Sequence, residues 1–208
     1  MDVSRQQTET RNERGPRART RRLMLAAATR LMQAGTIPSV TDVAEAADVS
    51  RATAYRYFPS QAALVHAVVH EALGPILDWK SGSRDARVRT KSLLTASIPR
   101  IEAFEATFRA ALKHALDQWA MRNAGTESSE PQFTRGHRIA LLRDAVAPLA
   151  GSMAPHMLDR LIKALSLLFG IEALIILKDI WGMEGEEARE VILWAADLLV
   201  ASADNHGR

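Results

Sequence analysis

Apolar residues recur along almost the whole sequence at spacings of three and four, the spacing of one face of an α-helix. No stretch sustains the strict alternation of apolar and polar residues that marks a half-buried strand. The pattern therefore predicts an all-α protein. The expected helices, about nine in number, cover residues 19–34, 40–47, 51–58, 61–73, 85–99, 101–123, 137–149, 156–181 and 186–203. The polar, aperiodic segment 124–136 is the expected internal loop.

Two features of the composition narrow the class of protein. The 208 residues include no cysteine, which excludes a disulfide framework and fits a reducing cytoplasm. The longest apolar run, residues 164–177, contains Ser166, Gly170 and Glu172 and is too short and too polar to span a membrane. No apolar stretch follows the basic N-terminus before Leu23, so no secretory signal is visible. We expect a cytoplasmic protein without membrane contact.

The excess positive charge is confined to the first third of the chain. Residues 1–73 hold ten arginines against seven acidic residues, which accounts for the whole net charge of +3. Seven of these arginines precede residue 23, and residues 1–18 are expected to form a basic, disordered arm. A basic arm beside a neutral body suits a polyanionic partner. On charge alone, a solvated tail explains it equally well.

The second and third expected helices are short and lie close together. Ser39 can cap the second helix, and Asp42 three residues later completes a capping-box pattern. Asp48 falls at the turn, where Asp tolerates a left-handed backbone, and Ser50 can cap the third helix. Two short helices joined by so tight a turn predict a helix-turn-helix, which we place in a three-helix domain at residues 19–66.

The third helix has one face for the core and one for a partner. Ala54 and Phe58, four residues apart, are the candidates for the core. The opposite face centres on Arg56, with Ala52 and Thr53 beside it. An arginine can bind guanine, a threonine offers a hydroxyl and a methyl, and an alanine allows close approach. This face is suited to the DNA major groove.

Two tyrosines flank that face. The hydroxyls of Tyr55 and Tyr57 can reach phosphates on the walls of the groove. Backbone N–H groups at the starts of the second and third helices can also bind phosphate. The alternative is a surface helix whose tyrosines pack on neighbouring helices, and we expect such packing of Tyr55 more than of Tyr57.

Residues 21–68, and especially the stretch PSVTDVAEAADVSRATAYRYFPSQAALVHAV, closely resemble the N-terminal domain of the TetR family of bacterial transcriptional regulators. The resemblance implies that the DNA contacts are made by Ser39, Thr41, Arg51, Ala52, Thr53, Tyr55, Arg56 and Tyr57. Gln61 stands where the family commonly has a lysine that meets phosphate, so we expect a polar contact without the charge. Arg17 in the arm and Arg19 at the start of the first expected helix are expected to compensate for it.

The last part of the chain resembles the two helices that form a four-helix dimer interface in this family. Residues 160–201 carry this resemblance, and the helix around residues 161–177 is apolar on nearly all faces, so it needs cover on both sides. Glu172 within it is expected to cross the interface to an arginine, and contact with a cationic ligand is the alternative. The expected interface residues are Leu161, Leu165, Leu168, Glu172, Ile175, Val191, Trp194, Ala195 and Leu198. Residues 67–208 are then a helical ligand-binding and dimerisation domain.

An apolar stripe in the expected helix 101–123 runs through Phe104, Phe108, Leu112 and Trp119. Ordinary core is one explanation for each of these residues. The other is a pocket for an apolar or aromatic small molecule. The resemblance implies that such a molecule would act as an inducer that lowers the affinity for DNA.

Enzymatic function is the main alternative. The sequence has no glycine-rich phosphate loop and no G-x-S-x-G motif. His66 and His70 lie four residues apart, as half of a metal site for an enzyme or sensor, but no third ligand is evident and surface histidines explain them better. We therefore expect neither a metal nor a cofactor.

A nonspecific DNA-binding protein is the remaining alternative, although its charge would be spread over the body. The sequence favours a homodimeric regulator of double-stranded DNA, in the role of a repressor released from a palindromic operator by a small molecule. It would act in the cytoplasm and on the nucleoid when bound to DNA.

Overall fold

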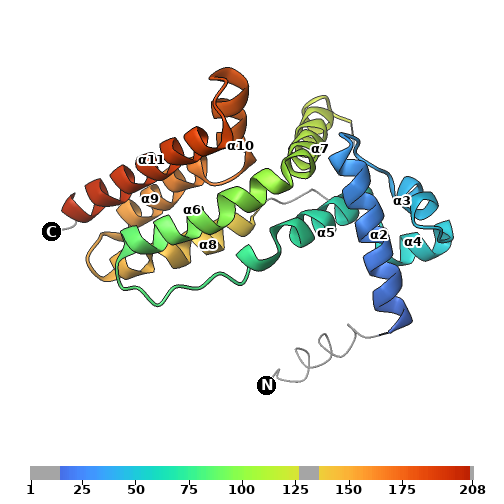
Figure 1. Ribbon diagram of the computed structural model, residues 1–208, viewed down its shortest axis with the longest axis horizontal. Coiled ribbons are helices and arrows are strands. Elements are labelled where there is room, and N and C mark those ends of the chain that lie inside the picture. The colour runs from blue at the N-terminus through green and yellow to red at the C-terminus, as the bar shows by residue number, and fades with distance from the viewer. Residues whose placement is uncertain (1–14, 127–135, 207–208) are drawn as a thin grey trace. The chain divides into compact units, whose positions relative to one another are not determined.

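The computed structural model describes residues 15–126 and 136–206 of the chain, with side chains to residue 203. Within these residues all regular structure is helical, as predicted, and ten α-helices are present (Figure 1). The contacts divide the chain into two compact units, residues 1–71 with 106–133 and residues 72–105 with 134–208. The first unit thus extends past the predicted domain end at residue 66 and includes most of helix α7.

The first unit contains the predicted helix-turn-helix. Its helices are α2 (Pro16–Gln33), α3 (Val40–Ala46), α4 (Arg51–Tyr57), most of α5 (Gln61–Leu73) and most of α7 (Glu105–Asn123). Helix α2 begins at Pro16 and not at Arg19, because proline is well suited to the first helical position. Residues 16–18 are therefore helical, while residues 1–14 of the expected arm and most of the expected loop 124–136 lie outside the described residues.

Local hydrogen bonds fix the turn between α3 and α4. The Ser39 backbone N–H donates to Asp42 Oδ2 over 2.8 Å, and the Asp42 N–H donates to Ser39 Oγ over 3.1 Å, which confirms the capping box. Asp48 has a φ of 53°, the left-handed conformation expected there. The Thr53 N–H donates to Ser50 Oγ over 3.2 Å at the start of α4. These caps orient two short helices that propensity alone would not stabilise.

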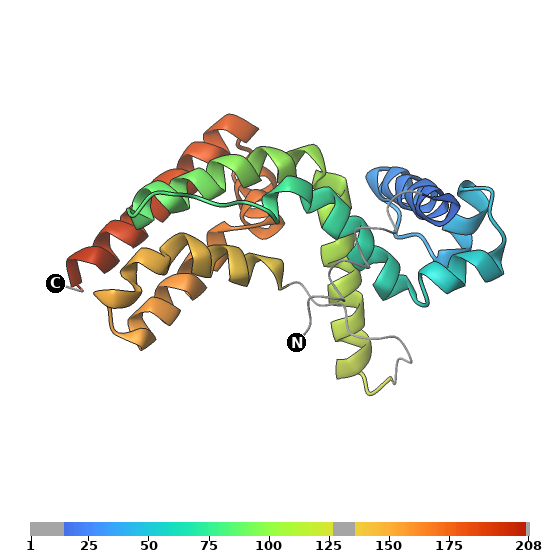
Figure 2. The same ribbon diagram turned by 90° about the horizontal axis from the view of Figure 1, so that it is seen from below.

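The second unit is built on four packed helices, α6 (Ala86–Ala103), α8 (His137–Val146), α9 (Pro155–Leu168) and α11 (Gly185–His206), which Figures 1 and 2 show side by side. Shorter elements join them: η2 (Gly74–Ile76), η3 (Ala147–Gly151), α10 (Ile171–Ile175) and the π-helical turn η4 (Ile176–Ile180). The largest fully buried side chains of this unit are Leu93, Leu94, Leu142, Leu165, Leu174 and Ile192.

Two further predicted helix boundaries are wrong. The expected helix 156–181 is divided at Gly170, which has a φ of 132° that other residues rarely adopt. A Cβ at this position would lie only 2.8 Å from Glu172 Oε2 and 2.9 Å from Arg138 Nη2. The second error concerns Pro99, which lies inside α6 on an exposed face and does not end the helix; the break comes at Phe104.

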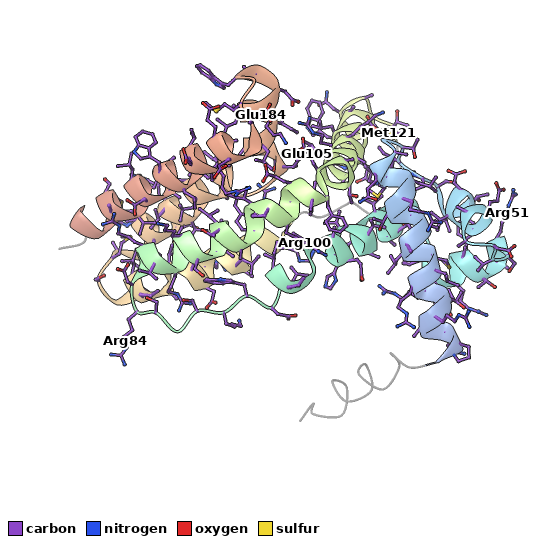
Figure 3. All side chains as sticks on the ribbon, in the orientation of Figure 1. Arg51, Arg84, Arg100, Glu105, Met121 and Glu184 are labelled. Atoms are coloured by element: carbon purple, nitrogen blue, oxygen red, sulfur yellow. The ribbon has the colours of Figure 1, made fainter. Side chains whose placement is uncertain are left out.

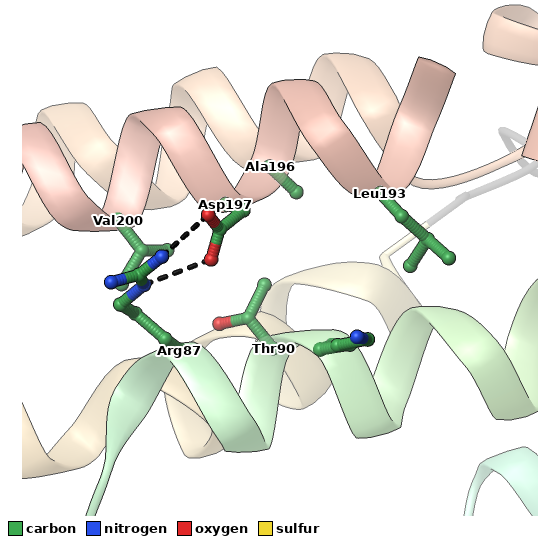
Figure 4. A pocket seen from close by; sticks show the side chains of 7 residues that line it. Arg87, Thr90, Leu193, Ala196, Asp197 and Val200 are labelled. Atoms are coloured by element: carbon green, nitrogen blue, oxygen red, sulfur yellow. Dashed lines mark hydrogen bonds and ion pairs between the residues drawn. The ribbon is translucent and has the colours of Figure 1, made fainter. Parts of the chain in front are cut away.

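Arginines of α6 fix this helix to its neighbours in the second unit. Arg87 makes two hydrogen bonds, of 2.8 and 2.6 Å, to the carboxylate of Asp197 on α11 (Figure 4). The buried Arg89 donates to backbone carbonyls at the end of α8, among them that of Asp144 over 2.8 Å, and to the Ser83 carbonyl over 3.1 Å. Arg89 thus caps α8 and holds the segment that precedes α6.

Candidate nucleic-acid interface

Helix α4 presents the outward face that the sequence predicted. Ala54 and Phe58 are buried, with 0% and 3% of their surfaces exposed, so they are core residues as expected. Arg51, Ala52, Tyr55 and Arg56 are exposed, and Arg51 projects from the edge of the first unit in Figure 3. A seven-residue helix therefore combines a small apolar anchor with a face of two arginines, an alanine and a tyrosine.

The two tyrosines differ in a way that reverses our expectation. Tyr55 is 49% exposed, whereas Tyr57 is half-buried and its hydroxyl donates to the Arg17 carbonyl of α2 over 3.2 Å. The Arg56 guanidinium lies 5.8 Å from the centre of the Tyr57 ring. A phenol has a single hydrogen to donate, and phosphate oxygens only accept. Tyr57 therefore cannot serve Arg17 and a phosphate at once, and Tyr55 is the tyrosine available to DNA.

The remaining predicted contacts on α4 are partly engaged within the chain. Arg51 forms an ion pair of 3.0 Å with Glu45 of α3, in which both side chains are about two-thirds exposed, at 69% and 66%. Such an exposed pair contributes little to stability, so a phosphate can replace the carboxylate at low cost. The Thr53 hydroxyl accepts a 2.9 Å hydrogen bond from Ser50 Oγ and keeps its own hydrogen for a partner.

Gln61 has a structural role that the sequence did not indicate. Its Nε2 donates to the carbonyls of Ile37 and Pro38, over 3.3 and 3.1 Å. These bonds hold the segment that leads into α3. The Gln61 side-chain nitrogen, which we expected to contact a DNA phosphate, therefore already donates to two carbonyls of its own chain. Ser39 and Thr41 at the start of α3 are both half-buried.

Helix α2 contributes more exposed positive charge than we predicted. Arg17 and Arg19 are exposed on the helix and do not belong to an arm, and Arg21 and Arg22 are exposed beside them. The Arg21 guanidinium lies 5.9 Å from the ring of Phe58, which brings it to the end of α4. We did not predict Arg21 and Arg22 as DNA contacts, although they lie beside Arg19 in the first turn of the expected helix 19–34.

The cap of α3 lowers the pKa of an acidic residue in this surface. The hydrogen bond from the Ser39 backbone N–H, with the further bond to the Ser39 side chain, holds the pKa of Asp42 below its ordinary value. Asp42 therefore stays ionised, and its charge stabilises the positive end of the α3 dipole.

The residues predicted for a dimer interface lie in different surroundings in the structure. Leu161 and Leu165 are buried in the core of their own unit and are not available to a partner. Glu172 forms an ion pair of 2.9 Å with Arg138 of the same chain, so it already has an arginine partner within its own unit. Ile175 and Val191 are half-buried. The others line an apolar groove between α9 and α11, whose walls are Ala164, Leu167, Leu168, Trp194, Ala195, Leu198, Leu199 and Ser202.

The four residues predicted to contact a ligand are not alike in the structure. Phe104 is the C-cap of α6, where the Arg100 guanidinium lies 4.4 Å from its ring. Phe108 is buried on α7 and Leu112 is half-buried, whereas Trp119 is 59% exposed. The buried face of α7 is instead more polar than expected, because it includes Thr107, His114 and Gln118. We did not predict these buried polar residues, because the prediction followed the apolar stripe on the neighbouring face of the helix.

The metal-site alternative finds no support in the described residues. Among residues 15–126 and 136–206, no three His, Cys, Asp or Glu side chains lie close enough together to hold a metal ion, and the cluster that His66 and His70 would need is missing there. None of the described helices combines the length and apolar character needed to cross a membrane.

Known proteins are similar to this chain at two levels. Residues 24–68 match the sequence model of the bacterial regulatory proteins of the tetR family. The fold is similar to the crystal structure of a TetR transcriptional regulator from Rhodococcus sp. RHA1, with a TM-score of 0.54 and 19% identity over 89% of this chain and 97% of that one. No curated protein matches the chain. The predicted resemblance is thereby confirmed: residues 24–68 match the tetR family of bacterial regulatory proteins, and the fold of the chain is similar to that of a TetR transcriptional regulator.

Proposed function

We propose that the protein is a homodimeric transcriptional repressor that binds a palindromic DNA operator in the cytoplasm, on the nucleoid. The observation that carries this proposal is the exposed face of α4, where Arg56 is flanked by Ala52 and Tyr55 above a buried Ala54. Arg56 is suited to read guanine in the major groove, and Tyr55 and the arginines of α2 are suited to bind phosphates. With one α4 per subunit, the half-sites would lie about one DNA turn, roughly 34 Å, apart.

Dimerisation in this proposal uses the apolar groove between α9 and α11. Leu167, Trp194 and Leu198 line it with 74%, 65% and 49% of their surfaces exposed. Exposed apolar surface of this kind is unfavourable in water and favours a partner. A second copy of the chain is the partner that a palindromic operator requires, because the symmetry of the site mirrors that of the protein.

Release by a small apolar or aromatic molecule completes the proposal. A ligand changes the affinity for DNA only to the extent that it binds one conformation of the protein better than another. Phe104, Phe108, Leu112 and Trp119 remain the candidate contacts, and the burial of Phe108 makes it the first to test. Substitution of Phe108 by Leu, which keeps most of the buried apolar volume, should weaken the response to an inducer while leaving the affinity for DNA in its absence unchanged.

Fluorescence anisotropy against DNA from upstream of the protein's own gene, with scrambled DNA as reference, tests the DNA-binding proposal. We expect at least a thousandfold preference for a specific site. Arg56→Ala should weaken specific binding by about 1–3 kcal/mol and relax the preference at one base position of each half-site. Arg143→Ala, an exposed arginine on α8 with the same change in charge, is the matched control. Equal loss in both variants would contradict base reading by Arg56, because net charge alone would explain it.

A further inference from the structure

A small cavity lies between α6 and α11 in the second unit (Figure 4). Its volume is about 10 Å³, and four of the seven residues that line it are polar or charged: Arg87, Thr90, Lys91 and Asp197. A cavity needs about 10–15 Å³ to hold one water molecule. This cavity therefore has room for a single molecule of that size and is too small for an organic ligand such as an inducer.

The hydroxyl of Thr90 is the group in this cavity that requires a partner. Thr90 is only 2% exposed, and its Oγ1 makes no hydrogen bond within the part of the chain that the structure describes. Figure 4 shows this hydroxyl on the side of Thr90 that faces the Arg87–Asp197 pair. A buried hydroxyl without a hydrogen bond is unfavourable, and most such groups are satisfied by the protein or by ordered water.

The carboxylate of Asp197 can serve a second partner besides Arg87. Its Oδ1 accepts from Arg87 Nε over 2.8 Å, and its Oδ2 accepts from Arg87 Nη2 over 2.6 Å. An ionised carboxylate has about four acceptor positions, so the two bonds from Arg87 leave further positions for another donor. The cavity thus combines a buried hydroxyl on α6 with an acceptor on α11.

The charges around the cavity disfavour an ion. A cation would lie beside the positive charges of Arg87 and Lys91, and a hard cation needs several oxygen ligands. An anion would lie beside the carboxylate of Asp197, and chloride is larger than the water molecule that the cavity just admits. The molecule that suits this site is therefore neutral and both donates and accepts hydrogen bonds, as water does.

We propose that one ordered water molecule binds in this cavity and links Thr90 of α6 to Asp197 of α11. The water accepts the hydrogen of the Thr90 hydroxyl and donates one of its own to the carboxylate. It joins the same two helices as the Arg87–Asp197 pair, and it satisfies a hydroxyl that this pair does not reach. The inference concerns the packing of the second unit and does not depend on the proposed DNA binding or dimerisation.

Replacement of Thr90 by Val, which has nearly the same shape, tests the water link in urea unfolding. Because the variant loses the hydrogen bond to the water, its unfolding midpoint should fall by about 0.5 M. An unchanged or raised midpoint would overturn the inference, since removal of a hydroxyl without a partner does not destabilise a protein.

Thr107→Val is the matched control. Thr107 is also fully buried, with an Oγ1 that makes no hydrogen bond in the described residues, but it does not line this cavity. Its unfolding midpoint should not fall. An equal fall in both variants would show that the substitution itself lowers stability, and the inference would fail.

A high-resolution crystal structure provides the direct measurement. We expect a water peak within about 2.5–3.2 Å of both Thr90 Oγ1 and a carboxylate oxygen of Asp197. The peak should remain in Thr90→Ser, which keeps the hydroxyl, and should be lost from this position in Thr90→Val. No peak in the native protein, or the same peak in Thr90→Val, would refute the link through Thr90.

Discussion

Replacement of Tyr57 by Phe, compared with the same change at Tyr55, tests which tyrosine hydroxyl of α4 stabilises the fold and which one binds DNA. Tyr57→Phe removes only the 3.2 Å hydrogen bond to the Arg17 carbonyl and keeps the ring. A long, half-buried hydrogen bond between neutral groups contributes about 0.5 kcal/mol to the free energy of unfolding. With a urea slope of about 2 kcal/mol per molar, the unfolding midpoint should fall by about 0.25 M. The affinity for DNA should change less than about threefold.

Tyr55→Phe should do the reverse. The Tyr55 side chain is 49% exposed, so its loss of a hydroxyl should leave the unfolding midpoint unchanged. If each Tyr55 of a dimer binds one phosphate at a net gain of about 1 kcal/mol, the loss of both weakens DNA binding by about 2 kcal/mol, or roughly thirtyfold. Specific and scrambled DNA should be affected alike, because phosphates carry no sequence. The salt dependence should not change, since no charge is removed.

Urea unfolding at fixed protein concentration and fluorescence anisotropy on the same preparations provide both readouts. The reasoning is refuted if Tyr57→Phe weakens DNA binding as much as Tyr55→Phe and leaves the unfolding midpoint unchanged. The Tyr57 hydroxyl would then leave Arg17 for a phosphate when DNA binds.

Three further substitutions test the structure itself. Gly170→Ala should lower the free energy of unfolding in a urea titration by about 2–3 kcal/mol, because it strains a φ of 132° and displaces the Arg138–Glu172 pair. The control Gly182→Ala, at a φ of 67° with no atom within 4 Å, should lower it by only about 1 kcal/mol. Ser39→Ala should cost about 1 kcal/mol through loss of the capping box, and a cost as small as that of Ser152→Ala would contradict the cap. Asp197→Asn should cost less than about 1 kcal/mol at neutral pH, since the pair with Arg87 is half-exposed. The hydrogen bond from Arg87 lowers the pKa of Asp197, so this cost should be present above the ordinary carboxyl range and disappear as the pH falls through the lowered pKa, as thermal unfolding across pH 2–7 would show.

The elements whose signals are local could be predicted closely from the sequence. The capping box at Ser39 and the left-handed Asp48 need only neighbouring residues, and the structure has both. The anchor residues Ala54 and Phe58 follow from helical spacing alone. These features also determine which face of α4 points outward, so the exposed positions at Arg51, Ala52 and Arg56 needed no knowledge of tertiary structure.

The positions that depend on a distant partner could not be predicted. The hydroxyl of Tyr57 is used by Arg17, 40 residues away, and the amide of Gln61 by carbonyls 23 and 24 residues away. Arg138 satisfies Glu172 from 34 residues away. Periodicity indicates which way each side chain points, but not whether a hydrogen-bond partner from a distant part of the chain lies within reach of it.

The break at Gly170 also changes which residues need a partner. An unbroken apolar helix would need cover on all sides, and this expectation brought Leu161 and Leu165 into the predicted interface. In the structure α10 leaves the line of α9, and the apolar residues of both helices that face inward, such as Leu165 and Leu174, are buried within their own unit. The glycine that follows the apolar run is the signal that could have revealed this end. The apolar residues that remain exposed are then Leu167 on α9 and its neighbours Trp194 and Leu198 across the groove.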